Sequence, residues 1–106
     1  MALHHLAPGE KVQVPSPDQS IGVGAVALVK TDGFEAVELL MHSGQQISRH
    51  AVPGHCTIHC LNGSAILHTE KPIELCAGDW LYLDRGEEHS VTAVEAALLL
   101  VTIIFD

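Results

Sequence analysis

Histidine and cysteine side chains are concentrated in one short stretch of the sequence. Residues 55–60, HCTIHC, contain two imidazoles and two thiols, and His50 lies just upstream. Imidazoles and thiolates are the ligands that hold zinc and related transition metals in proteins. The stretch therefore leaves two alternatives open: a metal site, or a β-strand that carries imidazoles and thiols.

The spacing within this stretch favours a strand. The two thiols are separated by three residues, which is not a zinc-knuckle spacing. His55 and His59 would share a face as zinc ligands only on a helix, and the β-branched Thr57 and Ile58 between them favour a strand instead. Because strand side chains alternate, Cys56 and Ile58 should face the interior and His55 should face the opposite side.

Strand signals recur roughly every ten residues along the chain, with turn residues between them and no long 3.6-residue apolar period. Asn62-Gly63 predicts a tight β-hairpin. About nine strands without a helix must close as a barrel or jelly roll to cover their edges. The expected strands are residues 22–30, 34–42, 45–50, 55–61, 64–70, 73–76, 77–83, 89–94 and 96–105.

Composition excludes several classes of function. The chain has 106 residues, 47% of them hydrophobic, and suits one domain with a buried core. Its net charge of −8 and its five scattered Lys and Arg residues argue against nucleic acid or an anionic membrane as partner. No apolar run reaches the roughly 20 residues of a membrane helix, and the start lacks signal-peptide features, so we expect a cytoplasmic protein. Three cysteines are an odd number and predict free thiols.

Glycines and histidines at two places match a known pattern of spacing. In these residues the sequence resembles the cupin family, whose first motif is represented by Gly44, His50 and Gly63. The second motif is represented by Gly78, Gly86 and His89, with Asp84 in place of its proline and Ala93 in place of its asparagine. The resemblance covers residues 44–93. It implies an all-β, cupin-type double-stranded β-helix, a jelly-roll barrel, which we place at residues 19–106. Pro8, Pro15 and Pro17 predict an extended arm at residues 1–18.

The resemblance also implies a metal centre, but two of its four ligand positions are changed. His50 and His89 carry over as ligands, whereas Val52 stands at the second histidine of His-x-His and Cys56 stands at the glutamate. Cys56 is a candidate third ligand, and His55 is another if a bulge turns it inward. A divalent zinc, nickel or iron ion is one expectation, and a barrel without metal is the other.

Two functions follow from this reading. The first is binding of a small molecule in a barrel pocket formed by His50, Val52, Cys56, Ile58 and His89. The alternative is a metal-dependent cupin enzyme, an oxygenase or isomerase acting on a small organic substrate. We also expect a homodimer, because the apolar content is high for so short a chain and the N-terminal arm could add a strand to the sheet edge of a partner.

Overall fold

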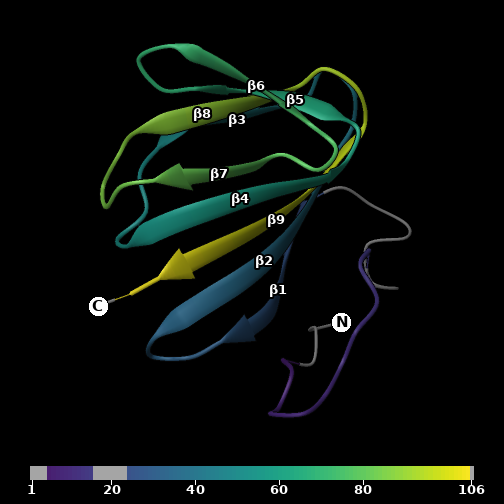
Figure 1. The fold of residues 1–106 in the computed structure, drawn as a ribbon, viewed down its shortest axis with the longest axis vertical. Coiled ribbons are helices and arrows are strands. Elements are labelled where there is room, and N and C mark those ends of the chain that lie inside the picture. Colours follow the sequence, from purple (N-terminus) through teal and green to yellow (C-terminus); the bar gives the residue numbers. More distant parts are fainter. Residues whose placement is uncertain (1–4, 16–23, 106) are drawn as a thin grey trace.

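The computed structural model describes residues 5–15 and 24–105 (Figure 1). Within these ranges the chain contains nine strands and no helix, so the all-β prediction is confirmed. No helix that could cross a membrane is present in the same ranges. The strands are β1 (Gly24–Lys30), β2 (Phe34–Met41), β3 (Gln46–His50), β4 (His55–Asn62), β5 (Ser64–His68), β6 (Pro72–Cys76), β7 (Trp80–Leu83), β8 (His89–Ala93) and β9 (Ala97–Ile104).

The predicted boundary between an arm at residues 1–18 and a barrel at residues 19–106 falls outside the described residues. The part of the arm that is described contacts its own barrel. The backbone N–H of Leu6 donates a hydrogen bond to the carbonyl oxygen of Leu28 in β1, at 2.9 Å.

Two antiparallel sheets make up the barrel. The larger sheet has the order β1-β2-β9-β4-β7, and the smaller one has the order β3-β8-β5-β6. β9 is therefore the central strand of the five-stranded sheet, and it pairs with β2 on one side and with β4 on the other. Figure 1 shows the smaller sheet above and behind the larger one.

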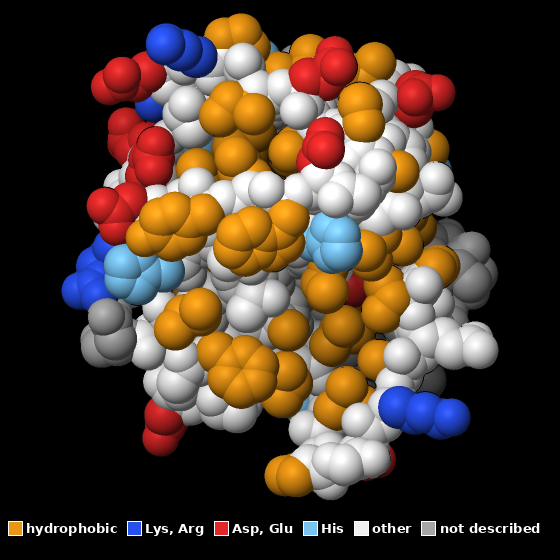
Figure 2. All heavy atoms as spheres, in the orientation of Figure 1, with side chains coloured by type: hydrophobic (Ala, Val, Ile, Leu, Met, Phe, Trp, Pro, Cys, Tyr) orange, Lys and Arg blue, Asp and Glu red, His pale blue; other side chains and the backbone are white. Residues whose placement is uncertain are grey.

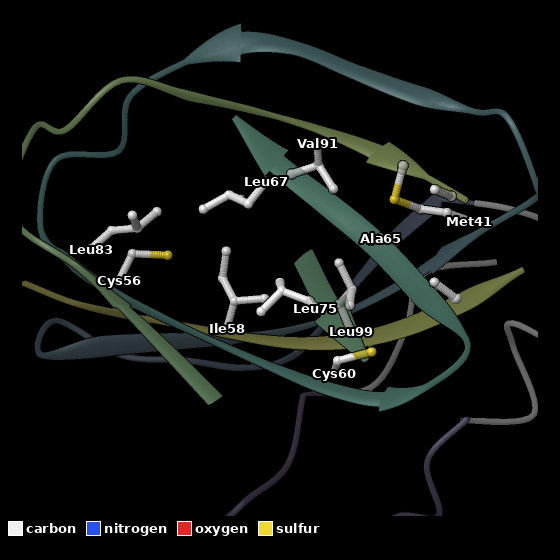
Figure 3. Close-up of a cluster of buried hydrophobic side chains, with 12 residues drawn as sticks. Met41, Cys56, Ile58, Cys60, Ala65, Leu67, Leu75, Leu83, Val91 and Leu99 are labelled. Atoms are coloured by element: carbon white, nitrogen blue, oxygen red, sulfur yellow. The ribbon is translucent and has the colours of Figure 1, made fainter. Parts of the chain in front are cut away.

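Alternating side chains fill the space between the sheets. In β4 the buried positions are Cys56, Ile58 and Cys60, with partly exposed residues between them. This period of two is what a strand with one face on a core requires. Figure 3 shows these side chains directed into the space between the sheets, where Leu67 and Val91 approach them from the smaller sheet. Cys56, Cys60 and Cys76 are free cysteines, as their odd number predicted.

The predicted hairpin at Asn62-Gly63 is wrong. β4 belongs to the five-stranded sheet and β5 to the four-stranded sheet, so the two strands do not pair and the chain crosses between sheets at this point. Gly63 has a φ of 75°, whereas no non-glycine residue in the described chain has a positive φ, so Asn62 lacks the backbone conformation of a type I′ turn. A Cβ on Gly63 would meet the carbonyl oxygen of Ala96, so the crossing requires glycine.

Candidate functional site

A cavity of about 240 Å³ lies between the two sheets. Ten of its thirteen lining residues are aliphatic, and the others are His50, Cys56 and His89. The five residues that the sequence suggested for a pocket, His50, Val52, Cys56, Ile58 and His89, all line it.

Sequence reasoning did not assign the other lining residues to the site. Alternation along the expected strands contained the signal for most of them, because Val37 and Leu39, and likewise Leu99, Val101 and Ile103, are two residues apart and therefore share a face. The residues missed are Ala25, Val37, Leu39, Ile47, Val91, Leu99, Val101 and Ile103.

His50 and His89 form a pair at one end of this cavity. They are directly opposite each other in the antiparallel pairing of β3 with β8, and their ring centroids are 4.4 Å apart. The register shifts between Ile47 and His50, so that three residues of β3 span two residues of β8. This β-bulge lets Ile47 and His50 both line the cavity, although they are three positions apart and a regular strand would place them on opposite faces.

Each of the two rings is held by the backbone carbonyl of the residue two positions earlier in the chain. Nδ1 of His50 lies 2.9 Å from the carbonyl oxygen of Ser48, and Nδ1 of His89 lies 3.0 Å from that of Glu87. A carbonyl oxygen only accepts, so each Nδ1 donates its proton, and a ring in the neutral form keeps an unprotonated Nε2. The pair therefore presents two hydrogen-bond acceptors at the polar end of an apolar cavity.

The charge state of His89 follows from its burial. Its side chain is 3% exposed, and this burial lowers its pKa below the ordinary value of 6.5, with the nearby His50 acting in the same direction. The hydrogen bond to Glu87 opposes this shift. His89 is consequently neutral at pH 7, whereas His50 is exposed at the mouth of the barrel.

The donors present do not fit the four-ligand metal centre that the cupin resemblance implies. Val52 offers no donor atom. Cys56 is only 1% exposed, and its burial raises the pKa of the thiol to about 11, which disfavours the thiolate that binds metals. Among residues 5–15 and 24–105, no three His, Cys, Asp or Glu side chains form a group that could hold a metal ion.

His55 points to the opposite side of β4 and does not line the cavity. Its Nδ1 lies 2.8 Å from the hydroxyl of Tyr82, and the two rings are stacked with centroids 5.9 Å apart. The carboxylate of Asp84 is 3.5 Å from the same Nδ1, and Arg85 approaches Nε2 at 3.5 Å. The alternation of β4 thus separates His55 from His50 and His89.

Comparison with known proteins supports the fold. No protein-family model and no curated protein matches the sequence. Solved structures do match over nearly the whole chain. A cupin superfamily protein from Desulfitobacterium hafniense has a TM-score of 0.81 at 17% identity and covers 100% of both chains. A conserved protein of unknown function from Streptococcus pyogenes has a TM-score of 0.78 at 21% identity, covering 100% of this chain and 98% of that one.

A third structure, an RmlC-like cupin from Shewanella frigidimarina, has a TM-score of 0.74 at 19% identity and covers 98% of this chain and 93% of that one. The chain therefore has the fold of a small cupin, a double-stranded β-helix, as its motif spacing predicted. Sequence identities of 17% to 21% establish a shared fold only. The evidence on function therefore comes from the cavity.

Proposed function

We propose that this chain is a cytoplasmic small-molecule binding cupin whose cavity holds a compact, mostly apolar ligand with a neutral hydrogen-bond donor at one end. The observation that carries the proposal is the composition of the cavity, in which ten aliphatic side chains surround one pair of imidazoles. Ligand sites of this kind combine a predominantly apolar lining with a few polar groups that fix orientation.

The size of the cavity limits the ligand. An apolar cavity of about 150 Å³ accommodates benzene, so the 240 Å³ here suits one substituted ring or a short branched chain. The polar end of the ligand should be a hydroxyl, because neutral imidazoles with Nδ1 already donating can only accept at Nε2. A carboxylate fits poorly, because His89 is buried and its lowered pKa opposes the protonation that a carboxylate partner would need.

Calorimetric titration with two compounds of equal size tests this function. We expect p-cresol to bind at least about fivefold more tightly than p-xylene, a difference of ~1 kcal/mol for one neutral hydrogen bond. His50→Leu should reduce that preference, since it removes one of the two acceptors, and Val101→Phe should weaken both compounds by filling the cavity. Val94→Phe, at an exposed loop position, is the matched control. Absence of binding by both compounds, or binding unaffected by Val101→Phe, would contradict the proposal.

A metal-dependent enzyme, an oxygenase or isomerase acting on a small organic substrate, is the second candidate. One observation favours it: both imidazoles donate Nδ1–H to a carbonyl, which is the orientation that metal-ligating histidines usually have. Elemental analysis of protein purified without an affinity tag separates the two functions. Zinc, nickel or iron near one equivalent per chain would favour the enzyme, and less than about a tenth of an equivalent would favour ligand binding without metal.

A further inference from the structure

The imidazoles of His50 and His89 offer two hydrogen-bond acceptors side by side, whereas one acceptor would be enough to orient a single hydroxyl group. The two residues are directly opposite each other on β3 and β8, and their ring centroids are 4.4 Å apart. Nδ1 of each ring is engaged by a backbone carbonyl, at 2.9 Å and 3.0 Å. In the neutral form both rings therefore keep a free lone pair on Nε2, and this state is set before a ligand enters.

The rest of the cavity wall supplies no strong hydrogen-bond donor. Ten of the thirteen lining residues are aliphatic, and the thiol of Cys56 is the remaining polar group beside the two imidazoles. That thiol is directed at the carbonyl oxygen of Thr57, 3.9 Å away, and a thiol is a weak donor in any case. A ketone, ether or nitro group would consequently lose its hydrogen bonds to water on entering. The polar atoms of a well-matched ligand must donate.

Charge at and around the cavity excludes ionic ligands. The residues that line it include no Lys, Arg, Asp or Glu, so an ammonium or carboxylate would be removed from water without a counter-ion. The chain carries a net charge of −8, which also repels anions. Figure 2 shows acidic side chains toward the top and left margins of the five-stranded sheet, and side chains that cover the centre of its outer side. The donors of the ligand are therefore neutral.

Two adjacent hydroxyl groups can reach both rings at once. A hydrogen bond from a hydroxyl group spans about 2.5–3.0 Å, so hydroxyl groups on neighbouring carbon atoms can each approach a different ring of a pair whose centroids are 4.4 Å apart. A ligand with one hydroxyl group satisfies one ring only. The ligand body then displaces water from the second acceptor without replacing its hydrogen bond, which weakens binding.

We propose that the ligand of the cavity is a vicinal diol, a compact apolar molecule with hydroxyl groups on two neighbouring carbon atoms, and that each hydroxyl group donates to Nε2 of one imidazole. The inference rests on the proposed small-molecule binding function and specifies the ligand class. His50 and His89 determine specificity together, and the aliphatic wall holds the carbon skeleton of the ligand. A cavity of 240 Å³ accommodates a six-membered ring with two hydroxyl groups.

Two isomers of equal composition test the proposal. Calorimetric titration at about pH 8, where an imidazole is ordinarily neutral, should compare cis-1,2-cyclohexanediol with trans-1,4-cyclohexanediol. We expect the 1,2-isomer to bind at least about tenfold more tightly, because the 1,4-isomer buries one hydroxyl group without an acceptor. Equal affinities of the isomers would overturn the proposal.

Cyclohexanol distinguishes a failure of this inference from a failure of the proposed function. If cyclohexanol binds and the two diols do not differ, the cavity binds small molecules but does not select a vicinal diol. If none of the three compounds binds, both the function and the inference are wrong.

Substitution of one imidazole locates the selectivity. His50→Leu removes one acceptor at an exposed position, where the fold should tolerate leucine, and should reduce the preference for the 1,2-isomer to less than about threefold. His42→Leu, which replaces an imidazole exposed between β2 and β3, is the matched control and should change the preference less than about twofold. An unchanged preference in His50→Leu would contradict the assignment.

Nitrogen NMR of protein labelled with ¹⁵N-histidine observes the two hydrogen bonds directly. The Nε2 resonances of both His50 and His89 should shift when cis-1,2-cyclohexanediol is added, since an unprotonated nitrogen responds to a donor. A shift of only one resonance would overturn the proposal. The titrations should be repeated with a chelator, because a metal ion between the imidazoles would also bind a diol. A preference that disappears with the chelator would show that the metal ion, rather than the imidazole pair, selects the ligand.

Discussion

His50 and His89 are opposite each other on neighbouring strands, with their rings 4.4 Å apart and each Nδ1 on a backbone carbonyl. Two imidazoles in this arrangement offer two acceptors from one side of a cavity. Val52 lines the same cavity, at the position where the cupin pattern has a further histidine. Two of the four ligand positions that the cupin resemblance implies are therefore histidines here, and the Val52 position offers no donor atom.

Val52→His should restore a third imidazole and strengthen metal binding. Three imidazoles and a water make a good site for zinc or nickel, whereas the wild-type chain provides two. We expect the affinity for both metals to rise at least about tenfold, or ~1.4 kcal/mol. Calorimetric titration of the two proteins with zinc and nickel measures this difference.

His89→Ala in the Val52→His background is the control and should abolish the gain. Equal metal affinities of wild type and Val52→His would mean that the new imidazole does not join His50 and His89.

The buried neutral state of His89 predicts that stability falls on acidification. Burial lowers the pKa of His89 in the folded chain. Below about pH 6.5, His89 is therefore protonated more readily in the unfolded chain than in the folded chain. The stabilisation that neutral His89 contributes is fully present above the pKa that His89 has in the unfolded chain. It is lost as the pH falls from that value toward the lower pKa that His89 has in the folded chain. Urea unfolding at pH 7.5 and 5.5 should show a smaller loss for His89→Asn than for wild type. An equal loss would mean that other groups carry the acid sensitivity.

Strand alternation was enough to predict the nine strands of the described residues and the inward face of β4. The pattern of β4, with Cys56 and Ile58 inside and His55 outside, follows from a period of two that tertiary contacts do not disturb. The motif spacing also brought His50 and His89 to one cavity, because it reflects strand lengths that the barrel fixes.

Which strands pair, and in what register, could not be predicted from the residues of one strand or turn alone. The Asn62-Gly63 dipeptide predicted a hairpin, yet β5 pairs with β6 and β8, because burial of both sheets decides which edges meet. Likewise, the β-bulge before His50 depends on the register of β3 against β8. Nothing in residues 46–50 alone shows that Ile47 and His50 share a face.

Two glycine substitutions should distinguish the cost of a Cβ that overlaps neighbouring backbone from the cost of a positive φ. Gly63 and Gly86 have similar φ values, 75° and 71°, but only Gly63 has backbone atoms where a Cβ would lie, those of Ala96 and Ala97. Gly86→Ala should cost about 1 kcal/mol for the left-handed conformation. Gly63→Ala should cost roughly 2 kcal/mol more, since the crossing between sheets must open. Urea unfolding gives both values, and similar costs would mean that the chain near Ala96 yields without strain.

The three thiols should react at very different rates. Cys76 is exposed, whereas Cys56 and Cys60 are buried at 1% and 0% exposure, and burial raises the pKa of Cys56 to about 11. The thiolate is the reactive species, so a disulfide reagent such as Ellman's should label one thiol quickly in the folded protein and three after unfolding in urea. Cys76→Ser should eliminate the fast phase. If Cys56 reacted at a rate comparable to Cys76, reagent would have to enter the barrel past His50 and His89, and the cavity would be far more open than its lining indicates.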